Sequence, residues 1–146
     1  MEYVIQLLAA LVGSFGFSLI FNPGKKILFP STLGGMLGWA VYLLCEHLGF
    51  GVFVSTIIAA AFCQVYAEVF ARILKAPATV FYIPSIVPLV PGGSLYYTVF
   101  YAATNNMEMF KSYGITTLQV AFGIGVGASF VSAIMLLLKK PKLKKV

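Results

Sequence analysis

Residues 84–94 read PSIVPLVPGGS, with three prolines and two adjacent glycines between the apolar segments ATVFY and LYYTVFYAAT. Proline lacks an amide hydrogen and clashes with the carbonyl group four residues earlier. A continuous helix would leave the carbonyl groups of Val80, Pro84 and Val87 without partners, and each costs several kcal/mol in lipid. We therefore predict a helix break in this stretch. Its motif residues are Pro84, Pro88, Pro91 and Gly92.

The composition places this break in a membrane. The chain has 146 residues, of which 60% are hydrophobic and 10% charged, whereas soluble domains are nearer half apolar and a quarter charged. We predict one all-α transmembrane domain over residues 1–146. About 20 helical residues cross the hydrocarbon core, so the uncharged stretches give five spans and a basic tail: 3–22, 31–47, 51–72, 78–105 (broken), 115–138 and 139–146. The second span is the shortest, and whether it crosses fully stays open.

The charges separate into two groups when five spans are counted. Every lysine and arginine except Lys111 falls on one side: Lys25, Lys26, Arg72, Lys75 and the lysines of the tail. The positive-inside rule then predicts an external N-terminus and a cytoplasmic C-terminus, in a multi-pass protein of the cell (inner or plasma) membrane. The net charge of +6 thus indicates topology and contact with lipid head groups, not nucleic-acid binding.

Small residues at four-residue spacing predict close helix packing. They form three sets: Ser55, Ala59, Cys63 and Ala67; Ala121, Gly125, Ser129 and Ala133, flanked by Gly123 and Gly127; and Gly34 with Gly38. Beside the first set, Thr56, Ala60, Gln64, Glu68 and Arg72 form a face that becomes polar. Two readings of this polar end stay open: an interfacial Glu–Arg pair, or a substrate-facing or proton-coupling group.

The sequence contains no constellation typical of an enzyme. It has one histidine, no His/Cys cluster with metal-ligand spacing, no paired carboxylates and no phosphate-binding loop. We therefore expect no catalytic residue, no metal and no cofactor.

A helix that restarts after the break would expose its first amides, which carry the positive end of the helix dipole. Transporters use such discontinuous helices to hold a substrate carboxylate. We therefore hypothesise that substrate binds at Pro88, Pro91, Gly92, Gly93, Ser94 and Tyr97. The alternative is a kinked helix that only shapes packing.

The stretch FYIPSIVPLVPGGSLYYTVFYA at 81–102, with LIFNPGKKIL at 19–28, resembles the threonine/serine exporter family, specifically its small membrane subunit. The resemblance implies a secondary, proton-linked exporter of threonine, serine or related small carboxylates. It also implies a larger membrane subunit of the same family as partner, in a hetero-oligomer. The alternative is a non-transporting scaffold or assembly subunit.

Overall fold

The computed structural model describes residues 1–21 and 24–138, and within these residues every regular element is a helix, so the predicted all-α class is confirmed. The predicted basic tail, 139–146, lies outside the described residues. The elements are α1 (Glu2–Ile20), α2 (Lys25–His47), α3 (Val52–Leu74), α4 (Thr79–Ile86), the short 3₁₀ helix η1 (Val87–Leu89), α5 (Gly92–Ala103) and α6 (Met107–Leu138).

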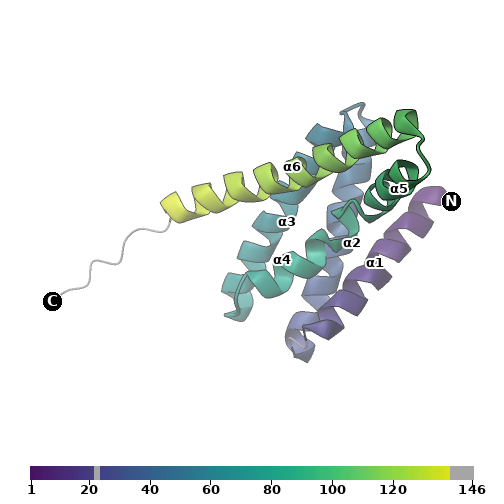
Figure 1. The fold of residues 1–146 in the computed structure, drawn as a ribbon. Helices are drawn as coiled ribbons and strands as arrows, with labels where there is room; N and C mark the ends of the chain where they lie inside the picture. Colours follow the sequence, from purple (N-terminus) through teal and green to yellow (C-terminus); the bar gives the residue numbers. More distant parts are fainter. Residues whose placement is uncertain (22–23, 139–146) are drawn as a thin grey trace.

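Four helices, α1, α2, α3 and α6, are long and apolar enough to cross a membrane. The segments Thr79–Leu89 and Gly92–Ala103 pass the same test together, bent by 50°, and give a fifth span if the bent pair counts as one. In Figure 1, α4 leads from the α3 side of the bundle toward α5, near the N-terminus. The predicted broken helix is therefore present.

Two helices begin earlier than the charge pattern predicts. α2 begins at Lys25 rather than at residue 31 and has 23 residues, which at 1.5 Å per residue is about 35 Å, enough to cross. α6 begins at Met107 rather than at residue 115. Glu108 lies in its first turn, where a negative charge stabilises the helix dipole, so the charged residues extend the helix instead of delimiting it.

The helix connections gather at two opposite ends of the bundle (Figure 1). The N-terminal end holds the start of α1, the α2–α3 turn and the α5–α6 turn. The basic end holds the start of α2, where Lys25 and Lys26 lie, and the α3–α4 turn, which follows Arg72. The segregation of charge predicted from the sequence is therefore present in the described residues.

α2 lies at the centre of the bundle and contacts α1, α3 and α4. Three buried glycines of α2 face other helices at close range: Gly34 faces Ser85 of α4, Gly35 faces Ser14 of α1, and Gly38 faces Cys63 of α3. A side chain at any of these glycines would meet its neighbour, so the absence of one is what brings the helices together. The predicted packing role of Gly34 and Gly38 is confirmed.

α3 and α6 pack along a glycine pair that differs from the predicted stripe. Gly123 faces Thr56, and Gly127 faces the backbone of α3 at Ile57; both glycines are buried. The predicted α6 stripe of Ala121, Gly125, Ser129 and Ala133 is exposed, so that prediction is wrong. The flanking glycines have the same four-residue spacing without any side chain, and they allow α3 to approach more closely. On α3, the predicted small face of Ser55, Ala59, Cys63 and Ala67 is fully buried.

Candidate functional site

The helix break is shorter than three prolines suggest. Pro84, predicted as part of the break, lies inside α4, and Pro88 lies in η1. A single proline removes one amide and bends a helix without ending it, and Pro84 is fully buried against α2, so packing holds the helix through it. Only Val90 and Pro91 separate η1 from α5.

Pro91 turns the chain into α5. It has φ −77° and ψ 51°, close to the centre of an inverse γ-turn, and the Gly92 amide donates to the Val90 carbonyl oxygen at 2.7 Å. The next intrahelical bond runs from the Leu95 amide to the Pro91 carbonyl oxygen at 2.9 Å. Within the described part of the chain, the amides of Gly93 and Ser94 have no acceptor. These two amides carry the positive end of the α5 dipole.

A cavity of about 200 Å³ lies beside this break; we call it the break cavity. Its walls come from every helix except α1 and α4: Trp39, Tyr42, Val52, Thr56, Pro88, Leu89, Val90, Pro91, Ser94, Thr116 and Val120. Of the residues predicted to bind substrate, Pro88, Pro91 and Ser94 are therefore brought together. Gly92 and Gly93 are exposed, and a methyl group added at either one would meet no described atom within 4 Å. Tyr97 packs against Tyr113 instead, with the two rings tilted by 33° and their centroids 5.2 Å apart.

The polar groups of the break cavity are hydroxyls. The hydroxyl groups of Thr56, Ser94 and Thr116 donate to the carbonyl oxygens of Val52 (2.7 Å), Pro91 (3.2 Å) and Ser112 (3.1 Å), respectively. Each hydroxyl oxygen keeps acceptor capacity, because a hydroxyl has one hydrogen and two lone pairs. None of the wall residues is charged.

An aromatic pair of α2 forms one wall, and sequence reasoning did not assign it to the site. Trp39 and Tyr42 stack at 5.0 Å between ring centroids. The Trp39 indole Nε1 donates to Gln6 Oε1 of α1 at 3.2 Å, and the Tyr42 hydroxyl donates to Glu46 Oε1 at 3.0 Å. The sequence does hold a signal for this pair: Trp39 and Tyr42 are three residues apart, which places both rings on one face of the helix.

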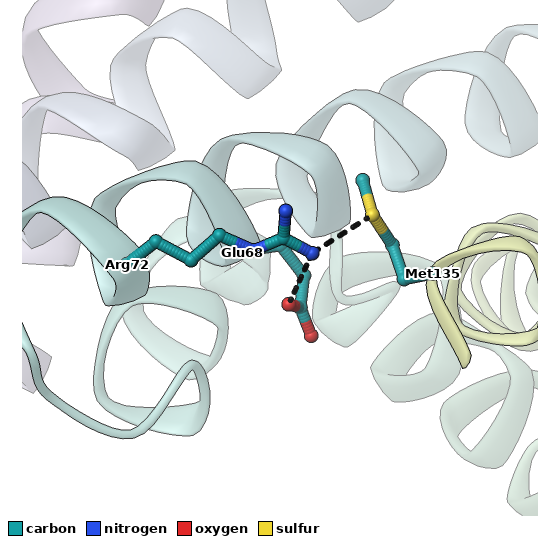
Figure 2. Close-up of polar contacts among 3 residues, drawn as sticks. All are labelled: Glu68, Arg72 and Met135. Carbon is teal, nitrogen blue, oxygen red and sulfur yellow. Dashed lines mark hydrogen bonds and ion pairs between the residues drawn. The ribbon is translucent and has the colours of Figure 1, made fainter. Parts of the chain in front are cut away.

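The second predicted polar site, Gln64, Glu68 and Arg72, lies elsewhere. Figure 2 shows Glu68 and Arg72 of α3 with Met135 of α6. Glu68 Oε2 is 3.9 Å from Arg72 Nη2, which also donates to the Met135 sulfur at 3.5 Å. The Arg72 side chain is 58% exposed and that of Glu68 is 16% exposed. Arg72 thus reaches α6, Gln64 is buried on α3, and none of the three residues is part of the break cavity wall.

The remaining chemistry of the described residues is limited. No group of three His, Cys, Asp or Glu side chains among them could hold a metal ion.

The sequence model of the threonine/serine exporter family, ThrE, matches residues 6–134. No solved structure matches the chain.

Proposed function

Since the chain belongs to the threonine/serine exporter family, we propose that it is the small membrane subunit of a secondary exporter that moves threonine, serine or related small carboxylates. The observation that carries this proposal is the break cavity, where an interrupted membrane helix borders a mostly apolar space with a few hydroxyl groups in its wall. Non-helical backbone at membrane depth is stable only where protein covers it or where it lines a wet cavity.

The start of α5 suits the substrate carboxylate. The free amides of Gly93 and Ser94 are two donors at the positive end of a helix, and such ends bind anions. Ser94 also belongs to the cavity wall. A carboxylate bound there would accept hydrogen bonds from these two amides, which have no acceptor within the chain.

The hydroxyl groups suit the rest of an amino acid. An ammonium group needs acceptors, and the hydroxyl oxygens of Ser94 and Thr116 retain lone pairs. With no charged side chain in the wall, a zwitterion is met by dipoles of both signs.

The exposure of α5 supports a partner subunit. None of its residues is buried, and Tyr96 and Val99 are 65% and 62% exposed. Within this chain α5 packs mainly on α6. A half-helix with free amides cannot face lipid alone without an energetic penalty, so we propose that the larger membrane subunit covers it and that lipid contacts the remaining apolar surface.

Orientation follows from the charges. We propose that the basic end faces the cytoplasm and the N-terminal end faces outward, since Lys25, Lys26 and Arg72 lie at the basic end. The cavity walls Val52 and Tyr42 lie near the α2–α3 turn, so the break cavity would lie in the outer half of the membrane.

The experiment is efflux of labelled threonine, serine and succinate from loaded cells that produce this chain, the larger subunit, or both. We expect efflux only with both chains, and at least a tenfold loss when Gly93→Val narrows the approach to the α5 amides. Because nothing in this chain lies within 4 Å of a methyl group built at Gly93, this chain should still fold, and its assembly with the larger subunit is checked by co-purification. Gly16→Val in α1, where space is equally open, is the matched control.

The rival function is a non-transporting scaffold. Under that reading, Gly93→Val and Gly16→Val would assemble and export alike, and all substrate dependence would map to the partner.

A further inference from the structure

A second cavity shares two wall residues with the break cavity. It has a volume of about 270 Å³ and lies against α1, with walls from Gln6, Ala9, Ala10, Trp39 and Pro88; we call it the α1 cavity. Trp39 and Pro88 belong to the walls of both cavities. These two residues therefore form the partition between them.

The two halves of the partition differ in mobility. Pro88 is fixed in η1, since its ring locks one backbone angle. The Trp39 indole is held by two contacts that side-chain rotation can break: the hydrogen bond to Gln6 Oε1 at 3.2 Å and the stack on Tyr42, with ring centroids 5.0 Å apart. Gln6 is itself an uncharged side chain of α1 that also lines the α1 cavity.

We propose that the Trp39 indole separates the break cavity from the α1 cavity and rotates to connect them, and that its hydrogen bond to Gln6 holds it in the closed position. A solute that passes between the cavities has to displace the indole and break the bond to Gln6. The size of the indole then limits which amino acids pass, so Trp39 determines specificity. This inference rests on the proposed function, because it describes how a substrate bound in the break cavity would pass into the α1 cavity.

The hydrogen bond between Trp39 and Gln6 can be tested by fluorescence without substrate, because Trp39 is the only tryptophan of the chain. In the purified full-length chain in lipid nanodiscs, Trp39 emission is recorded with acrylamide as quencher. We expect Gln6→Leu to raise the quenching constant at least twofold and to shift the emission. Gln6→Glu keeps an acceptor oxygen and should restore values near wild type. Gln119→Leu on α6, an identical change at an exposed glutamine away from Trp39, should change neither quantity.

The partition is tested by efflux with both subunits present. We expect Trp39→Ala to raise the ratio of leucine to threonine efflux at least fivefold. Trp39→Phe and Gln6→Leu should each raise the ratio by a smaller, similar factor, and the double variant should not exceed either single one, because both remove the same hydrogen bond. If the Trp39→Ala protein does not accumulate in cells, the efflux ratios of Trp39→Phe and Gln6→Leu decide the test.

Two results would overturn the inference: quenching in Gln6→Leu equal to that in Gln119→Leu, or an efflux ratio that none of the partition variants changes. Failure of the proposed function looks different, since wild-type cells would then export no threonine while the quenching result stands.

Discussion

Gly127 of α6 lies directly against the backbone of Ile57 in α3, so that a methyl group at 127 would meet the Ile57 carbonyl oxygen. The same methyl group would also lie 3.1 Å from the Ala60 side chain. The absence of a side chain at position 127 thus lets the backbones of α3 and α6 approach each other closely. Gly125, two residues earlier on α6, has nothing within 4 Å of a methyl group.

These two glycines make a matched pair for a test of the α3–α6 contact. Gly127→Ala should lower the free energy of unfolding by about 1–3 kcal/mol, because overpacking forces the backbones apart. Gly125→Ala should leave it unchanged or raise it slightly, since alanine favours helix over glycine. Thermal unfolding of both variants in the same detergent decides. Equal midpoints would show that α6 does not pack on α3 through Gly127.

A buried serine offers a second test. Ser14 is fully buried, and its hydroxyl has no hydrogen-bond partner among the described residues, whereas the Ser31 hydroxyl donates to the backbone of α2 and lies 3.1 Å from Ser18 Oγ. Ser14→Ala should be neutral or stabilising by up to about 1 kcal/mol, and Ser31→Ala should destabilise by about 1 kcal/mol. The two variants are compared by thermal unfolding, and a larger loss for Ser14→Ala would mean that its hydroxyl binds something this chain does not supply.

Thr116 tests the acceptors of the break cavity. Thr116→Val keeps the shape of the side chain but removes its hydroxyl from the cavity wall. We expect threonine efflux at low substrate to fall about ten- to hundredfold, as for loss of one hydrogen bond to a charged group. Thr117→Val is the control, since the Thr117 hydroxyl donates to the Tyr113 carbonyl oxygen at 2.8 Å and lies outside the cavity wall. Equal efflux in the two variants would remove Thr116 from the substrate path.

Topology has its own test in intact cells. Asn106→Cys in the α5–α6 turn should react with a membrane-impermeant maleimide from outside, and Val146→Cys should react only after permeabilisation. The native thiols, Cys45 and Cys63, are buried, so background labelling should be low. Labelling of Val146→Cys from outside would invert the proposed orientation.

Sequence reasoning succeeded where one residue type has one physical meaning. The cluster of Pro84, Pro88, Pro91 and Gly92 predicted the discontinuous helix, and the break lies at Val90–Pro91. The small face of α3 was found because its four members share one helical stripe, and all are fully buried.

The errors have a common cause, which is that packing decides among locally equivalent choices. Pro84 was predicted as part of the break, but it lies inside α4, where it is buried against α2. On α6, Gly123 and Gly127 and the stripe of Ala121 and Gly125 have the same periodicity, and only the approach of α3 distinguishes them. The aromatic wall was missed because Trp39 and Tyr42 meet η1 and the start of α5 only through tertiary packing, far along the chain from α2.

The most direct measurement of the central claim, that substrate occupies the break cavity, is protection of a cysteine placed in it. Ser94→Cys is alkylated in membranes that contain both subunits, with and without saturating threonine, and Asn106→Cys serves as the exposed control. We predict that threonine slows alkylation at position 94 at least fivefold, with a concentration dependence that matches transport, and leaves position 106 unaffected. Alkylation at position 94 that is equally fast with and without threonine, in membranes that export it, would contradict the account.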